Sequence, residues 1–267
     1  MTEASPQAVE SDPLRPHPPL TRYYADEAEH RRRIGAWFDA AAPDYNWINQ
    51  VLSFGSGNYY RRDALRRAGL AAGMRLLDTG CGTGIVAVQG QQIVGPSGEV
   101  VGLDPSTGML REAGRRGVRR RVRALAEALP FPDQRFDLLS MGYALRHVAD
   151  LRTTFQEYLR VLKPGGKVLL LEITPPRSRF ATAFLKLYLG RVMPLLARFG
   201  RGGRASQTLM EYYWDTIANC VPPDVILKAL RDAGFSQVER SVQMGMLSEY
   251  TAVRRRCTPT HDATPGP

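Results

Sequence analysis

Three closely spaced glycines after a short apolar segment constrain this chain more than any other feature. The segment Arg75–Asp78 has the composition of a short buried strand, and glycine follows it at positions 80, 82 and 84. Glycine allows the positive φ angles of a tight turn and lets backbone N–H groups approach a ligand at the start of the next helix. In an open α/β sheet, ligands bind outside the carboxyl ends of the strands, so this turn predicts a ligand site there.

Strand-like and helix-like segments alternate around this turn. The expected strands lie at 75–78, 99–104, 121–124, 136–141 and 167–173, with two closing strands at 238–243 and 249–253. The expected helices lie at 85–94, 107–117, 153–162 and 223–233. This alternation predicts a doubly wound α/β domain, built on a mostly parallel sheet.

Composition and patterning predict one domain over residues 21–256. The polar and proline-rich ends, 1–20 and 257–267, are expected to be disordered tails. An N-terminal helical cap is expected over 26–70. Residues 174–221 interrupt the alternation with an aromatic-rich stretch, which predicts a helical lid over the site.

The predicted cap contains a proline that divides it. Ile34, Trp37 and Phe38 share one face of a helix over 26–42, and Pro43 is expected to end that helix. A second short helix is expected near 47–52, and a third over 59–68.

Two cofactors compete for the glycine-rich turn, and a tight turn without a ligand is the plainer alternative. A dinucleotide fingerprint starting at Gly80 needs glycine at position 85, which is Ile85. A carboxylate at Asp78 would repel a pyrophosphate but suits the sulfonium and amino groups of S-adenosylmethionine. Asp104, at the end of the second strand, can accept ribose hydroxyls in either case. The turn from Asp78 to Gly84 therefore favours S-adenosylmethionine.

Four further blocks extend the pattern over most of the chain. They are Phe38–Gly55, Ala126–Asp137, Tyr143–Val148 and Tyr158–Gly166. Together they resemble the UbiE-type methyltransferases, which methylate a ring carbon of ubiquinone and menaquinone precursors. The first and third blocks narrow the resemblance to this quinone group.

The resemblance implies a Rossmann-like class I methyltransferase fold, with a seven-stranded sheet whose last strand is antiparallel. It implies S-adenosylmethionine contacts from Gly80, Gly82, Thr83, Asp104, Leu125, Ala126 and Gly142; the turn itself adds Asp78 and Gly84. There are departures from the family pattern. Leu125 stands where a polar residue is usual, and the block 143–147 has Tyr, Ala and His in place of Phe, Gly and Asn.

The same resemblance directs attention to three catalytic candidates. A hydroquinone ring carbon becomes nucleophilic when an adjacent hydroxyl loses its proton, so a base or a cation should lie nearby. We expect His147 to accept this proton, Arg146 to orient a water or stabilise the phenolate, and Tyr45 to help close the site. The plainer alternatives are a loop histidine and a packing aromatic. No metal is expected, because no side-chain cluster has metal-ligand spacing.

The net charge of +10 is concentrated in two segments. Residues 111–123 contain seven Arg and one Glu, and residues 175–210 contain seven Lys or Arg and no acid. No aromatics interleave the first segment, so no nucleic acid is expected. In the second, Leu185, Tyr188, Leu189, Val192 and Leu196 share a face flanked by basic residues. This pattern predicts either a lid helix or peripheral membrane contact through 184–200.

The N-terminus has no secretory apolar region, no apolar run reaches the roughly 18–20 residues that span a bilayer, and the three cysteines have no paired spacing. The expected location is therefore cytoplasmic, with peripheral contact to the inner membrane. The leading function is C-methylation of a prenylated hydroquinone, a small lipophilic aromatic substrate. Methylation of another aromatic or polyketide product is the alternative, and a nucleic-acid-binding relative is less favoured.

Overall fold

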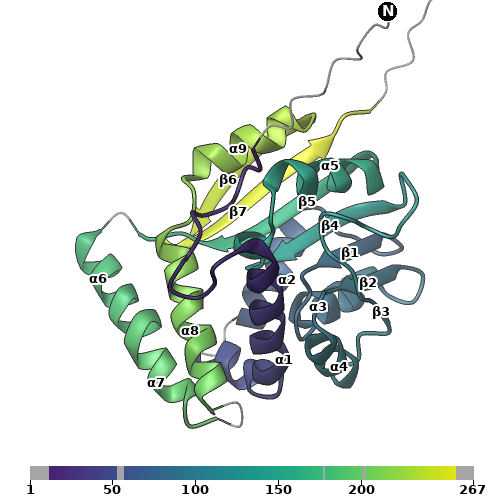
Figure 1. Cartoon of the computed structure of the whole chain (residues 1–267). Coiled ribbons are helices and arrows are strands. Elements are labelled where there is room, and N and C mark those ends of the chain that lie inside the picture. The colour runs from purple at the N-terminus through teal and green to yellow at the C-terminus, as the bar shows by residue number, and fades with distance from the viewer. Residues whose placement is uncertain (1–11, 53–56, 177, 201–202, 257–267) are drawn as a thin grey trace, which may run out of the picture.

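The computed structural model describes residues 12–52, 57–176, 178–200 and 203–256 (Figure 1). Seven strands form one sheet in the order β3-β2-β1-β4-β5-β7-β6. They are β1 Arg75–Thr79, β2 Glu99–Leu103, β3 Arg120–Val122, β4 Phe136–Gly142, β5 Leu162–Ile173, β6 Phe235–Gln243 and β7 Leu247–Arg254. Only β7 runs antiparallel to its neighbours, β5 and β6. The predicted mostly parallel sheet with an antiparallel last strand is therefore confirmed.

Helices cover both faces of this sheet. They are α1 Glu27–Leu52, α2 Gly57–Arg67, α3 Ile85–Val94, α4 Thr107–Arg115, α5 Leu151–Val161, α6 Arg179–Leu187, α7 Met193–Ala197, α8 Gly203–Ala218 and α9 Pro223–Asp232. Leu76 and Leu138 bury one face of the sheet under α2, α3 and α4. Leu77 and Leu139, one residue further along each strand, bury the other face under α5 and α9. Buried leucines on both faces explain the continuous apolar runs of the central strands.

A third core lies beyond the carboxyl ends of the strands. It joins α1, α6, α7 and α8 with the N-terminal segment through Tyr23, Ile34, Leu189 and Tyr212. These elements stand beside the sheet on one side in Figure 1, and α8 packs against both α1 and α7. Helix α1 of the cap and the predicted lid therefore form one helical unit at the strand-end side of the sheet, whereas α2 packs on the sheet itself.

Residues 12–20 do not behave as the expected tail. The Leu14 N–H donates to Asp150 Oδ1 (2.8 Å), the Leu151 N–H donates to the Leu14 carbonyl (3.0 Å), and the Val221 N–H donates to the Pro16 carbonyl (2.8 Å). These bonds attach the segment to the starts of α5 and α9. The pairing partners lie more than 130 residues away, so composition alone does not predict them. Residues 1–11 and 257–267 lie outside the described residues.

The expected break at Pro43 is wrong, because α1 runs through it to Leu52. Proline removes one helical hydrogen bond, and tertiary contacts elsewhere along the helix can offset that loss. One turn earlier, Asp39 Oδ1 accepts from the Ser106 hydroxyl (2.5 Å) and from the Gly108 N–H (2.8 Å), which anchors α1 on the start of α4.

The predicted apolar face of the lid is only partly right. The buried positions are Leu185, Leu189, Met193 and Ala197, one every four residues, whereas Val192 and Leu196 are exposed. A π-helical turn, Tyr188–Val192, joins α6 to α7 into one continuous helix and rotates the later residues relative to an α-helical register. The 19 residues Arg179–Ala197 are long and apolar enough to cross a membrane by composition, contrary to the expectation from the sequence, but one face packs on α8.

The Arg-rich segment 111–123 is largely engaged within the protein. Arg115 pairs with Glu112, Arg120 pairs with Glu99, and Arg116 Nε donates to the Thr83 carbonyl (2.9 Å). Arg121 donates to a backbone carbonyl in the segment after α4, and Arg123 donates to one in the segment after β2. These bonds favour a structural role for the segment over a phosphate-binding one.

Candidate active site

The turn between β1 and α3 is fixed by backbone geometry. Gly80, Gly82 and Gly84 have φ angles of 59°, 53° and 79°, all in the left-handed region that favours glycine. A Cβ at Gly80 would lie 2.6 Å from the Ala144 Cβ, and one at Gly84 would lie 2.5 Å from Val118 Cγ2. At Gly82 a Cβ would meet nothing within 4 Å. The turn is therefore pressed against its neighbours on two sides and open at its centre.

A cavity of about 300 Å³ opens in front of this turn, at the carboxyl ends of β1, β2 and β4. The predicted cofactor residues that line it are Asp78, Gly80, Gly82, Thr83, Asp104, Leu125, Ala126 and Gly142. Gly84 does not line it, which corrects the expectation for that residue. Gly84 instead begins α3 and lets the turn pack closely against Ala113 and Val118.

Asp78 presents to the cavity a buried carboxylate with one oxygen that is not hydrogen-bonded. It is fully buried, and its Oδ1 accepts from Ser140 Oγ at 2.7 Å. Its Oδ2 is buried too and has no hydrogen-bond partner among the described residues. Burial raises the pKa of Asp78 to about 7, against the hydrogen bond from Ser140. A ligand that carries an ammonium group would supply the missing donor and favour the charged carboxylate.

Asp104 is buried at the end of β2 and organises the turn as well as facing the cavity. Its Oδ2 accepts from the Gly82 N–H (2.8 Å) and its Oδ1 accepts from the Ser106 N–H (2.9 Å). Burial raises its pKa to about 6, while these two bonds oppose the shift. Each oxygen keeps a second lone pair, so the side chain can accept two neighbouring hydroxyls of a ribose.

The remaining cofactor-side residues come from loops that are tied together. Leu125 is exposed at the cavity mouth and Ala126 is buried beside it. Glu127 Oε1 accepts from the Ala149 N–H (2.6 Å), which joins this loop to the one that follows β4. Thr83 Oγ1 is buried without a hydrogen-bond partner among the described residues. The apolar slot beside Leu125 and Ala126 suits a flat heterocycle.

Arg61 is a cavity residue that sequence reasoning missed. It projects from α2, is buried, and lies over the Tyr143 ring with 5.0 Å between its guanidinium carbon and the ring centroid. Its charge also opposes the raised pKa of Asp78. An Arg beside an Asp with an unpaired oxygen matches an amino-acid group, with carboxylate and ammonium ends. Its place in the sequence, directly after Tyr59 and Tyr60, gave no signal of a cavity position.

His147 lines the cavity at the end of the loop after β4, within a group of aromatic side chains called here the acceptor side. Its ring stacks on Tyr212 (centroids 5.6 Å apart, planes at 27°) and meets the edge of Phe38 (5.3 Å). Ile34 and Tyr213 complete this side. These side chains come from α1, from the loop after β4 and from α8, so the structure brings together residues that are almost 180 positions apart in the chain. An aromatic wall beside an imidazole suits a ring with an ionisable hydroxyl.

Arg146 does not line the cavity, which corrects the expectation that it contacts the acceptor. It is fully buried, and its Nε donates to Glu172 Oε2 at 2.8 Å. Its other nitrogens donate to Thr216 Oγ1 (3.1 Å) and to the Tyr143 carbonyl (3.1 Å), while Glu172 Oε1 accepts from the Leu145 N–H (3.0 Å). Arg146 therefore fixes the loop that carries His147. The side chain of Tyr45 lies outside the described residues.

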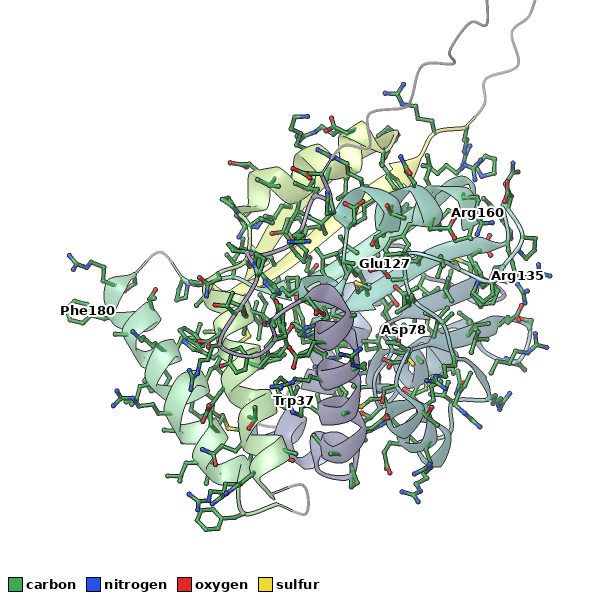
Figure 2. The ribbon with its side chains drawn as sticks, viewed as in Figure 1. Trp37, Asp78, Glu127, Arg135, Arg160 and Phe180 are labelled. Carbon is green, nitrogen blue, oxygen red and sulfur yellow. The ribbon has the colours of Figure 1, made fainter. Side chains whose placement is uncertain are left out.

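Within the described ranges, no cluster of three His, Cys, Asp or Glu side chains has metal-binding geometry. The donor set instead matches one organic ligand, with Asp78 for an ammonium, Asp104 for a ribose and the Leu125–Ala126 slot for an adenine. Figure 2 shows Asp78 on the sheet side of α1 and Trp37 on α1 itself. The residues present therefore fit S-adenosylmethionine.

Sheet order and cavity together define a class I S-adenosylmethionine-dependent methyltransferase. A solved S-adenosylmethionine-dependent methyltransferase from Thermotoga maritima, described as a possible histamine N-methyltransferase, has this fold. The two share 18% identity with a TM-score of 0.59, over 83% of this chain and 100% of that one.

The sequence profile of the ubiE/COQ5 methyltransferase family matches residues 26–254. A demethylmenaquinone methyltransferase of Symbiobacterium thermophilum is 33% identical over 85% of this chain and 95% of its own. The ubiquinone/menaquinone biosynthesis C-methyltransferase UbiE of Shewanella oneidensis is 35% identical over 81% and 88%. The chain belongs to the ubiE/COQ5 methyltransferase family, which confirms the resemblance, the enzyme class and the S-adenosylmethionine cofactor.

Proposed function

We propose that this methyltransferase transfers its methyl group to a ring carbon of a prenylated hydroquinone. The observation that carries the proposal is His147 on the acceptor side of the cavity, packed between Phe38, which also lines the cavity, and the fully buried Tyr212 behind it. The relatives named for demethylmenaquinone and for ubiquinone/menaquinone biosynthesis support the same acceptor class.

Bound S-adenosylmethionine supplies an electrophilic methyl group on a sulfonium, with a neutral thioether as leaving group. His147 takes the proton of a ring hydroxyl, and the electron pair this releases makes the neighbouring ring carbon nucleophilic. In this proposal that carbon would accept the methyl group, and its own hydrogen would leave as a proton to water while the His147 imidazolium returns its proton to the ring oxygen, so that one proton is released overall. Phe38 and Tyr213 line the cavity and hold the ring in line with the methyl group, and Tyr212 packs behind the His147 imidazole.

The other predicted site residues have supporting roles in this proposal. Arg146 is a positioning residue that acts through the backbone of the His147 loop. Tyr45 enters the proposal only as the residue expected from the sequence to help close the site, because its side chain lies outside the described residues. Peripheral contact with a membrane through residues 184–200 belongs to the same proposal, because a prenylated acceptor resides in a bilayer.

One observation keeps a second acceptor class open. Tyr143 takes a left-handed φ of 61° and stacks with Arg61, which brings a phenol into the cavity where the resemblance implies Phe, beside the cation of Arg61. A more polar cavity suits another aromatic or polyketide product. The same assay, run with hydroxylated aromatics that lack a prenyl tail, distinguishes the two classes.

The proposal is tested with S-adenosylmethionine carrying a 13C-labelled methyl group and a prenylated naphthohydroquinone kept reduced by dithionite. We expect the label on a ring carbon, at the chemical shift of an aryl methyl group. The matched control is the oxidised quinone, which has no hydroxyl proton for His147 to take and should give no product. Label on oxygen, or turnover only with unprenylated aromatics, would contradict the proposal.

A further inference from the structure

The outer face of the α6–α7 helix, defined here as Phe180, Phe184, Leu187, Leu195 and Phe199, exposes large apolar side chains. Phe180 is 90% exposed and Phe199 is 81% exposed. Of the eleven large hydrophobic residues exposed in the described part of the chain, seven lie between positions 180 and 199. This concentration on one helix marks an interaction surface, because scattered single exposures are normal and clustered ones are not.

The opposite side of the helix is buried in the protein, which is why the outer face stays exposed. Leu185, Leu189, Met193 and Ala197 are buried and belong to the core that contains Tyr212 and Tyr213. The helix therefore cannot turn its outer residues inward without emptying that core. Figure 2 shows Phe180 pointing away from the body at the start of α6, on the far side of α8 from Asp78.

The charges along this helix have one sign. From Ile173 to Met210 the sequence has seven Lys or Arg and no Asp or Glu. Arg179, Lys186, Arg191 and Arg198 are all exposed, and none of the ion pairs within the described residues involves them. An apolar face bordered by unpaired cations is complementary to a surface that is apolar inside and negatively charged at its rim.

We propose that the outer face lies flat on an anionic lipid bilayer, with its phenylalanines at the level of the acyl-chain boundary and its basic residues on lipid phosphates. The helix is roughly 28 Å long, from 19 residues at about 1.5 Å each, so the exposed apolar residues along it and Phe199 just after it offer an extended contact surface. Its buried side contacts α8, which supplies Tyr213 to the acceptor side. Delivery of a prenylated acceptor by this route rests on the proposed function, whereas the docking does not.

Two other occupants fit the outer face less well. A second copy docked by the same face would oppose four cations to four cations with no acid between them. A helix that spans the bilayer would have to leave α8 and expose Leu209 and Tyr213, which are buried against it. An anionic bilayer satisfies both the apolar residues and the charges while the domain stays folded.

The first test is flotation of the full chain with vesicles of phosphatidylcholine alone or with 40% phosphatidylglycerol. We expect binding to the anionic vesicles, weakening as salt rises. The triple variant Phe180→Ser, Phe184→Ser, Phe199→Ser should bind at least tenfold less. The triple variant Lys186→Gln, Arg191→Gln, Arg198→Gln should bind on the order of 100-fold less, at a factor of about five for each charge. The matched control Tyr59→Ser, Met244→Ser removes exposed apolar residues elsewhere and should bind normally.

Several results would overturn the proposal: no binding of the wild type to anionic vesicles, equal binding of the phenylalanine variant, a dimer in analytical ultracentrifugation that this variant abolishes, or resistance to carbonate extraction. A second assay separates docking from the proposed function. The phenylalanine variant should keep its turnover of a short-chain soluble hydroquinone and lose turnover of a long-chain one in vesicles. Vesicle binding without turnover of either hydroquinone would overturn the proposed acceptor and leave the docking intact.

Discussion

The two sides of the cavity are built by different kinds of interaction. On the cofactor side, Asp78 and Asp104 come from adjacent strands, and directional hydrogen bonds hold them and the Gly82 backbone. On the acceptor side, Phe38 and His147 come from distant segments and their rings pack together, while hydrogen bonds between Arg146 and Glu172 fix only the backbone that carries His147. Hydrogen bonds define the position of each atom, whereas ring contacts accept changes of shape. One side therefore suits a fixed cofactor, and the other can adapt to a particular acceptor.

Replacing His147 with alanine tests the acceptor side and should have the largest effect. We expect kcat to fall by about 10²–10⁴-fold, because the general base is lost. The Kd for S-adenosylmethionine, measured by calorimetry, should change by less than about threefold, since the Asp78 and Asp104 contacts remain. Added imidazole should restore part of the rate. An unchanged kcat, or a loss that imidazole cannot rescue, would leave His147 as a packing residue.

Replacing Asp104 with alanine tests the cofactor side and should reverse this pattern. The variant loses two charge-assisted hydrogen bonds to the ligand at about 1.5–3 kcal/mol each, so the Kd should rise on the order of 100-fold or more. Asp133→Ala is the matched control, since this carboxylate is exposed and pairs with Arg160. A rise of less than about threefold in the Asp104 variant would show that Asp104 does not hold the cofactor.

The same contrast explains which parts of the fold were predictable. Helix α3 was predicted with its observed bounds, Ile85–Val94, and all seven strands were found. The residues that form a buried strand and its turn are neighbours in the sequence, so their composition is enough to reveal them. The course of α1 through Pro43 and the attachment of residues 12–20 depend on partners far along the chain. Local propensity is a weak guide at such points, because tertiary packing decides them.

The candidate site divides in the same way. Eight of the nine predicted cofactor residues line the cavity, because strand ends and glycines reveal where a ligand lies. Gly84 has the same local sequence signal, but its backbone faces α4 instead. Arg146 and His147 are neighbours in sequence with opposite orientations, and only the buried partner Glu172 distinguishes them. Arg61 reaches the cavity from α2, which no spacing in the sequence indicated.

Two glycine substitutions measure how firmly the cofactor side is packed. Gly80→Ala combines a left-handed φ with a contact to Ala144 and should lower the free energy of unfolding by about 3 kcal/mol. Gly245→Ala, in the turn between β6 and β7, has a similar φ of 72° but meets nothing within 4 Å, so it should cost only about 1 kcal/mol. The difference, roughly thirtyfold in the folding equilibrium, is measured by urea unfolding. Equal losses would show that the turn is not pressed against the loop after β4.

A pH titration of cofactor affinity should give the smallest effect. Burial raises the pKa of Asp78 to about 7 in the free enzyme, and an ammonium bound beside it stabilises the charged carboxylate. The bound state then holds fewer protons than the free state below pH 7, so affinity should fall as pH decreases, by up to about tenfold per pH unit. Asp104, with a pKa raised to about 6, should steepen the fall below pH 6.

Two variants measured in the same titration show which side of the cavity carries the titrating group. Asp78→Asn should bind the cofactor weakly and lose the dependence between pH 6 and 7, because its side chain no longer titrates. His147→Ala should keep that dependence, because Asp78 is unchanged in this variant. If the histidine variant flattened the profile and the asparagine variant preserved it, the titrating group would lie on the acceptor side. The cofactor side of the cavity, which is held by hydrogen bonds, would then not be the part that recognises the cofactor's charge.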